Sequence, residues 1–331
     1  MAVYTEVSTE QVRALLLELK LGELQHMQGC AGGIENTNYF VSTRRDGATH
    51  DYVLTLFERL GFSQLPFYLR LMKHLAQRGI PVPEPTANAQ GELVFDLRGK
   101  PAAVVNKLRG QSELAPTTEH CAAVGKTLAR MHLAGRDFAM KQPNLRGLSW
   151  WNETVPVVLP ELSATQALLI RSELAFQNDV AASSAYAALP RGPIHTDLFR
   201  DNVMFETIGN EPHLSGFFDF YFAGVDSWIF DLAVCMNDWC VDLDSGAHHE
   251  QRARSLLHAY SQVRALSHDE LELLPAMLRG GALRFWISRL WDFYQPRAAS
   301  LLKAHDPSHF ERVLRQRVQH PMQPLAMLQA A

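Results

Sequence analysis

The stretch from Ile194 to Asn202, with the sequence IHTDLFRDN, decides how this chain of 331 residues is interpreted. His195, Asp197 and Asn202 occupy the fixed positions of the spacing H-x-D-x-x-x-x-N. A short apolar strand then leads to the sequence GFFDF, in which Asp219 is the acidic residue. The stretch therefore combines a carboxylate on a loop, an amide five residues later and a second carboxylate behind a strand. We refer to residues 195–202 as the HxD loop.

This spacing is typical of the catalytic loop of ATP-dependent phosphotransferases, which keep a second metal-binding carboxylate farther along the chain. Asp197 is the candidate catalytic base, because it is placed to accept a hydrogen bond from a substrate hydroxyl. Asn202 and Asp219 offer the hard oxygen ligands that suit Mg²⁺. His195, two residues before the aspartate, is expected to orient the loop rather than to act as a base.

The alternative is that these polar residues only form turns, because Asp and Asn both favour turn conformations. Three fixed letters would leave that alternative open. Asp219 directly behind an expected strand, followed by the helical segment 231–233, argues against it. The constellation as a whole therefore predicts phosphoryl-transfer chemistry.

Composition limits the other classes of protein. Hydrophobic residues make up 47% and charged residues 20% of the chain, as in ordinary globular proteins. The net charge of −4 gives no basic surface for nucleic acid or for an anionic membrane. The four cysteines lack zinc-ligand spacing, and we expect buried thiols in a reducing compartment. With no signal-peptide pattern and no apolar run near ~18 residues, we expect a cytoplasmic protein without membrane contact.

The first third of the sequence is rich in predicted strands. A capping box formed by Ser8 and Gln11 predicts a first helix. The other elements expected here are strands at 38–43 and 51–57 joined by a polar link at 44–50, a helix at 64–78, and strands at 91–95 and 101–106.

Helical periodicity dominates after Gly110, and short strands flank the HxD loop. Ser267 and Glu270 form another capping box. The segments expected to be helical are 117–134, 161–189, 248–263 and 267–291, and the short strands are 203–205 and 214–218. These patterns predict an α+β, two-lobed protein: a β-rich nucleotide-binding lobe, 1–106, and a larger helical lobe, 107–331, with the HxD loop and the substrate site. ATP would bind between such lobes.

A glycine-rich segment at 29–39 precedes the first predicted hairpin. Glycines allow close approach to phosphates, and successive N–H groups can surround an anion. The residues expected to contact phosphates are Gly32, Gly33, Asn36, Thr37 and Asn38. An ordinary hairpin turn is the alternative, since the segment matches neither complete phosphate-binding motif. Trp150 and Trp151 are expected to anchor the core or an interface more than to form a ligand platform.

Taken together, these residues resemble the aminoglycoside phosphotransferase and choline kinase-like superfamily, and within it type II homoserine kinases more closely. The resemblance spans about residues 5–300 in the expected order. The segments that carry it, besides the HxD loop and Asp219, are 33–41, 52–58, 65–69, 79–83, 147–151 and 231–240.

The resemblance implies a bilobal protein-kinase-like fold and ATP-dependent phosphorylation of L-homoserine to O-phospho-L-homoserine, on the route to threonine. It implies Asp197 as the base, and Mg²⁺ held by Asn202 and Asp219. Asp231 would brace the loop from a helix. The segment Asn106–Leu108 would be the interlobe hinge that meets adenine.

The chain differs from protein kinases at the strand lysine that binds the phosphates of ATP in those enzymes. Thr55 occupies the matching position and lacks the charge. Arg59 or Arg200 would compensate, with Arg200 counted among the catalytic residues, or the glycine-rich segment and the metal would suffice. Phe199 stands where protein kinases carry another lysine. These differences argue against a protein kinase.

An amino-acid substrate needs partners for its carboxylate and its ammonium group. Arg200, Arg284 and Arg289 are the candidates for the carboxylate. Asp238 and Asp226 are the candidates for the ammonium, and the sequence does not rank them. Two alternatives stay open: a related enzyme acting on an amino sugar, choline or ethanolamine, and a nucleotide-binding pseudokinase.

Overall fold

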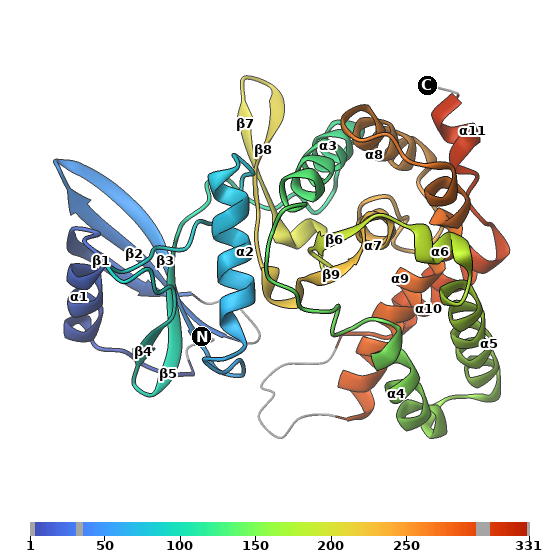
Figure 1. Cartoon of the computed structure of the whole chain (residues 1–331), viewed down its shortest axis with the longest axis horizontal. Coiled ribbons are helices and arrows are strands. Elements are labelled where there is room, and N and C mark those ends of the chain that lie inside the picture. Colours follow the sequence, from blue (N-terminus) through green and yellow to red (C-terminus); the bar gives the residue numbers. More distant parts are fainter. Residues whose placement is uncertain (1–3, 31–35, 296–304, 330–331) are drawn as a thin grey trace. The chain divides into compact units, whose positions relative to one another are not determined.

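The computed structural model describes residues 4–30, 36–295 and 305–329 of the chain (Figure 1). The chain divides into two compact units. The first unit comprises residues 1–109 and 215–221, and the second comprises residues 110–214 and 222–331. No helix within the described ranges combines the length and the apolar character needed to cross a membrane.

The first unit is built on a five-stranded antiparallel sheet with the order β1-β2-β3-β5-β4. The predicted hairpin is confirmed, but its connection is much shorter than 44–50. Only Asp46 and Gly47 lie between the strands, with φ of 54° and 79°, as a tight primed turn requires. The strands are β1 (Glu23–Gly29), β2 (Asn36–Arg45), β3 (Ala48–Phe57), β4 (Phe95–Leu97) and β5 (Lys100–Asn106).

Two helices complete the first unit. The predicted capping box of α1 (Thr9–Glu18) is present: Gln11 N–H donates to Ser8 Oγ at 3.2 Å, and Ser8 N–H donates to Gln11 Oε1 at 2.9 Å. The buried face of α1 joins one hydrophobic cluster with the sheet (Figure 1). The helix predicted at 64–78 is α2 (Leu65–Gln77), which Gly79 follows with φ of 74°.

The second unit is mainly helical. Its helices are α3 (Thr118–Ala134), α4 (Leu148–Val158), α5 (Ala164–Ala181), α6 (Ser184–Ala188), α7 (Trp228–Trp239), α8 (Glu250–Val263), α9 (His268–Tyr294), α10 (Ser308–Gln319) and α11 (Pro324–Gln329). Helix α9 is central, because α4, α5, α6, α7, α10 and α11 all pack against it (Figure 1). Its predicted N-terminal capping box, Ser267 with Glu270, is confirmed.

Short strands enclose the HxD loop in the sequence. Strand β6 (Arg191–Ile194) leads into the loop and pairs with β9 (Gly224–Ser227). Strand β7 (Val203–Ile208) leads out of it and forms a two-stranded sheet with β8 (Glu211–Phe217). The loop therefore starts and ends on regular backbone, which limits its freedom.

The α+β prediction, with a small β-rich unit and a larger helical one, is confirmed. Two predicted elements differ. The strand expected at 91–95 is β4, at Phe95–Leu97. The helix expected at 161–189 is interrupted: α5 ends at Ala181, and Ser183 caps α6 by accepting the Tyr186 N–H at 3.2 Å. The domain boundary at 106/107 stays a prediction, and the segment Ser215–Tyr221 groups with the first unit.

Candidate active site

The HxD loop is held by hydrogen bonds between its own residues. The carbonyl of Asp197 accepts the N–H of Phe199 at 2.9 Å and Nδ2 of Asn202 at 2.9 Å. The same Nδ2 lies 3.4 Å from Asp197 Oδ2. The N–H of Asp197 donates to Nδ1 of His195 at 3.3 Å. The structure thus brings three predicted site residues together, with the Asp197 side chain only partly buried.

Helix α7 holds the beginning of the loop through Asp231. This carboxylate is completely buried and accepts the N–H of His195 at 2.8 Å and the N–H of Thr196 at 2.7 Å. Thr196 has φ of 68°, a left-handed conformation that costs a β-branched residue about 1–2 kcal/mol. Two charge-assisted hydrogen bonds to adjacent N–H groups offset that cost. The Thr196 hydroxyl also donates to the carbonyl of Phe222 at 2.9 Å.

The same face of α7 holds the end of the loop. Asp238 lies seven residues after Asp231, two turns along the helix, so both side chains point in nearly the same direction. Asp238 accepts the N–H of Arg200 at 2.8 Å, and Nε1 of Trp239 donates to the carbonyl of Leu198 at 3.0 Å. One helix therefore contacts the loop near its start, its middle and its end.

A buried chain of polar groups continues behind Asp231. Nε2 of His132 lies 3.1 Å from Asp231, and Nδ1 of His132 lies 2.7 Å from the hydroxyl of Tyr260. Arg264 donates to that hydroxyl at 2.9 Å and pairs with Glu270 at 2.5 Å. Burial lowers the pKa of His132, so the neutral ring is favoured. Burial raises the pKa of Asp231, but its hydrogen bonds from His132 and from the N–H of His195 outweigh burial, and its pKa is lowered.

Arg200, predicted to act in catalysis, lies beside α7. Its Nε is 3.1 Å from Oδ2 of Asp238, its Nη1 donates to the carbonyl of Leu114 at 2.9 Å, and its Nη2 donates to the carbonyl of Asp238. The two residues considered for the substrate's carboxylate and ammonium therefore pair with each other. In this arrangement Arg200 braces the loop, and its predicted contact with reacting groups stays a prediction.

The other residues considered for an amino-acid substrate differ in their surroundings. Asp226 pairs with Arg191 at 2.9 Å and accepts Nδ2 of Asn144 at 3.0 Å. Nη1 of Arg289 donates to the carbonyl of Asp306 at 3.2 Å. Arg284 is buried, and no hydrogen bond or ion pair joins it to the part of the chain that the structure describes.

The predicted phosphate-contacting residues are only partly described. Gly32 and Gly33 lie outside the described residues. Asn36, Thr37 and Asn38 begin β2. The Thr37 hydroxyl is buried and donates to Oε1 of Glu58 at 2.8 Å, while Asn38 Oδ1 accepts the hydroxyl of Thr55 at 2.7 Å.

The predicted hinge and the second predicted metal ligand belong to the first unit. Oδ1 of Asn106 accepts the N–H of Glu84 at 2.5 Å, and the role of Asn106–Leu108 as a hinge stays a prediction. Asp219 lies between β8 and the single turn Phe220–Phe222, with φ of 65°. Burial, together with the charge of Asp219, raises the pKa of Tyr221.

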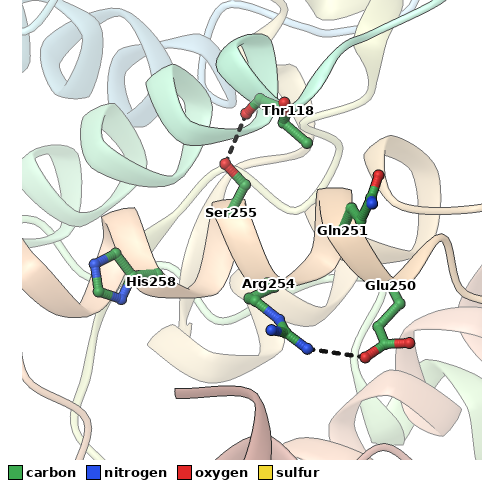
Figure 2. A pocket seen from close by; sticks show the side chains of 6 residues that line it. All are labelled: Thr118, Glu250, Gln251, Arg254, Ser255 and His258. Carbon is green, nitrogen blue, oxygen red and sulfur yellow. Dashed lines mark hydrogen bonds and ion pairs between the residues drawn. The ribbon is translucent and has the colours of Figure 1, made fainter. Parts of the chain in front are cut away.

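A separate pocket of about 460 Å³ lies at the start of α3 and along α8 (Figure 2). The residues that line it all have polar side chains. Figure 2 shows two contacts within it: Ser255 Oγ donates to the carbonyl of Thr118 at 2.8 Å, and Arg254 pairs with Glu250 at 3.0 Å. None of the residues predicted for the site lines this pocket. Across residues 4–30, 36–295 and 305–329, no three His, Cys, Asp or Glu side chains gather as a metal site.

Comparison with known proteins identifies the class. The sequence profile described as "Phosphotransferase enzyme family" matches residues 26–266. The chain belongs to this family, whose members transfer a phosphoryl group to a hydroxyl. Among curated proteins it is 63% identical to the homoserine kinase of Polaromonas naphthalenivorans, over 97% of this chain and 99% of that one. It is 55% identical to the homoserine kinase of Cupriavidus pinatubonensis, over 96% of each chain.

Solved structures with little sequence identity share the fold. Amicoumacin kinase hAmiN matches with a TM-score of 0.67 at 17% identity, over 98% of this chain and 100% of that one. Choline kinase from Cryptosporidium parvum matches with a TM-score of 0.61 at 14% identity, over 98% and 97%. The predicted protein-kinase-like fold and the resemblance to this superfamily are therefore confirmed.

Most of the hydrogen-bond partners of the loop were not apparent from the sequence. The segment 231–240 carries part of the family resemblance, which implies that Asp231 braces the loop. The sequence feature that corresponds to the contacts of Asp238 and Trp239 with the loop is the placement of polar residues at helical spacing on an otherwise apolar helix. His132 and Tyr260 had no signal, because they lie far apart in the sequence.

Proposed function

We propose that this protein transfers the γ-phosphoryl group of ATP to the hydroxyl of L-homoserine, yielding O-phospho-L-homoserine for threonine synthesis. The observation that carries this proposal is the 63% identity to a homoserine kinase over 97% of this chain and 99% of that one. The HxD loop supports it, since Asp197 and Asn202 are held side by side. We expect the enzyme to work in the cytoplasm.

In the proposed reaction the hydroxyl oxygen forms a bond to the γ-phosphorus. The bond from that phosphorus to the β,γ-bridging oxygen breaks, and ADP leaves with the electron pair. Asp197 orients the hydroxyl and takes its proton. Its carbonyl is fixed by Asn202 and Phe199, so the carboxylate is positioned before the substrate arrives. Positioning and charge neutralisation supply most of the catalysis in phosphoryl transfer.

We further propose that Asn202 and Asp219 hold Mg²⁺. The amide nitrogen of Asn202 is occupied by Asp197, so its oxygen is the end left for a cation. Mg²⁺ needs few protein ligands, because it retains waters and phosphate oxygens. When bound, the ion would neutralise charge on the phosphates. The amicoumacin kinase named above was solved with AMP-PNP and Ca²⁺, which supports a divalent cation.

For the nucleotide we propose the segment 29–39 at the phosphates and Asn106–Leu108 at adenine. The N–H of Asn106 donates to the carbonyl of Glu84 at 3.3 Å, and that of Lys107 to Asp51 at 3.0 Å. Within the described ranges the N–H of Leu108 has no such bond, which favours it for adenine. Thr55 donates to Asn38, so no strand cation is present at that position.

An acceptor panel tests the proposed function. Purified protein is given ATP with L-homoserine, an aminoglycoside, choline or ethanolamine, and ADP formation is measured. We expect the highest kcat/KM with L-homoserine; a higher value with another alcohol would replace homoserine as the acceptor. No turnover with any of them would favour the pseudokinase alternative.

The variant Asp197→Asn tests the assigned base. We expect kcat to fall by about 10²–10⁴, the usual contribution of a positioned acid or base. Asp201→Asn is the matched control, because its side chain is exposed and its main-chain carbonyl, not its carboxylate, accepts Ser112. If both variants retain activity, Asp197 is not the base.

A further inference from the structure

Arg284 is a buried cation that makes no hydrogen bond or ion pair with the described part of the chain. It lies on α9 with 4% of its surface exposed, and its Nε has no hydrogen-bond partner there. Two other arginines of α9 differ: Arg279 makes two hydrogen bonds to Glu173, at 2.8 and 2.7 Å, and Arg289 donates to a carbonyl. Arg284 therefore differs from Arg279 and Arg289 in having no hydrogen-bond acceptor among the described residues.

The surroundings of Arg284 do not remove its charge. Burial lowers its pKa to about 10, while the charge of Asp197 opposes that effect. The guanidinium is still protonated at neutral pH. It lies against the faces of two rings, Phe285 at 3.7 Å and Phe222 at 5.6 Å. Such contacts offset only part of the cost of burying a cation. A buried charge that the fold does not pair is expected to have a ligand.

A second cation lies on the same ring. The guanidinium of Arg146 is 6.0 Å from the ring of Phe222 and 4.3 Å from that of Trp150, and its charge further lowers the pKa of Arg284. Phe222 is tied to the HxD loop, because its carbonyl accepts the Thr196 hydroxyl at 2.9 Å. Two cations thus lie against the ring of Phe222, whose carbonyl holds the residue that precedes Asp197.

We propose that Arg284, with Arg146 beside it, binds the carboxylate of the amino-acid acceptor while the acceptor's hydroxyl meets Asp197. This inference rests on the proposed function and deepens it. A guanidinium binds a carboxylate through two parallel hydrogen bonds, and the aromatic rings suit the short apolar stem between carboxylate and hydroxyl. Of the other arginines considered, Arg200 is paired with Asp238.

The test compares two acceptors that differ only in the anionic group. L-Homoserinamide keeps the hydroxyl and the ammonium of L-homoserine but replaces the carboxylate by an amide. For Arg284→Met we expect kcat/KM to fall about a hundredfold or more with L-homoserine, as when one partner of a buried charge pair is removed. With L-homoserinamide we expect a change of less than about threefold, so that the preference of the wild type disappears. Arg284→Lys should recover part of it.

Arg279→Met is the matched control on the same helix. It removes a guanidinium that pairs with Glu173, so we expect a lower unfolding temperature and an unchanged preference for L-homoserine over the amide. Arg284→Met should instead unfold at a higher temperature than the wild type, since it removes an unpaired buried charge. A structural role for Arg284 would give the reverse.

Binding without turnover separates this inference from the proposed function. L-Homoserine should raise the unfolding temperature of the wild type but not that of Arg284→Met. An equal loss of kcat/KM on both acceptors with a raised KM for ATP would assign Arg284 to a phosphate and overturn the inference. No stabilisation of the wild type by L-homoserine would overturn it as well. Absence of wild-type turnover despite that stabilisation would defeat only the proposed function.

Discussion

Replacing Asp231 by asparagine should show how firmly the HxD loop is held. The carboxylate accepts from the N–H of His195 at 2.8 Å, the N–H of Thr196 at 2.7 Å and Nε2 of His132 at 3.1 Å. Asparagine offers one oxygen and one NH₂ group, so in either orientation one loop N–H faces another donor. A buried N–H without an acceptor costs about 1–3 kcal/mol, and the remaining bonds lose a charged acceptor. We expect a destabilisation of about 2–4 kcal/mol.

Loss of a hydrogen bond to Asp231 should also lower the catalytic rate, because the HxD loop carries Asp197. Thr196 is strained at φ of 68°, and the two hydrogen bonds to Asp231 hold it there. With one bond broken, the backbone before Asp197 can relax. A displacement near 1 Å of a reacting group costs about 10²-fold in rate, so we expect kcat to fall by about that factor with a smaller change in KM.

The measurements are a urea titration followed by tryptophan fluorescence and the steady-state rate with L-homoserine. Asp179→Asn is the control, because Asp179 is an exposed residue of α5 and its change should stay within about 0.5 kcal/mol. The reasoning is refuted if Asp231→Asn keeps the wild-type midpoint, the wild-type slope and a kcat within about twofold.

Two further predictions concern stability. Burial lowers the pKa of His248 to about 3, so below pH ~6.5 the unfolded chain binds a proton that the folded chain excludes. The free energy of unfolding should therefore decrease as the pH decreases, by about 2 kcal/mol at pH 5 for this residue. His248→Leu should remove that part of the fall between pH 7 and 5 in urea titrations, and an unchanged fall would contradict the assignment. Gly110→Ala should destabilise the protein by more than Gly91→Ala. Both glycines have positive φ, +86° and +84°, but only at Gly110 would a Cβ collide with a carbonyl, that of Phe205. Equal unfolding midpoints for the two variants would show that the chain moves aside at Gly110.

Local sequence patterns predicted the secondary structure correctly where a helix cap or a tight turn is determined by neighbouring residues. The capping boxes at Ser8 and Ser267, and the hairpin around Gly47, needed only neighbouring residues, and all three are present. The continuous helix at 161–189 was wrong because Ser183 caps a new helix, and its side chain competes with the helical hydrogen bonds of its neighbours. Strands β6 and β9 were missed, since a four-residue pair separated by the whole site has no periodicity to recognise.

The candidate site shows the same division between local and distant information. Asp197 and Asn202 are five residues apart on one loop, so their spacing alone placed both at one site, and the structure brings them into contact. The pairing of Arg200 with Asp238 joins residues far apart in the sequence, and both had been considered for a substrate instead. The solitary position of Arg284 depends on every neighbour of α9, which no local pattern describes.

Helix α7 is an example of a sequence motif that is typical of a family although its residues do not contact the substrate. The segment from Asp231 to Cys240 carries the resemblance to homoserine kinases, yet Asp231, Asp238 and Trp239 bond to the backbone of the HxD loop. A helix that must satisfy several fixed N–H and carbonyl groups tolerates few substitutions, whatever alcohol is phosphorylated. The choice of acceptor then depends on residues outside that segment, and Arg284 is a buried charge that makes no hydrogen bond or ion pair with the described part of the chain. A variant of α7 should therefore lower activity towards every acceptor alike, whereas a variant of Arg284 should change the order of preference among them.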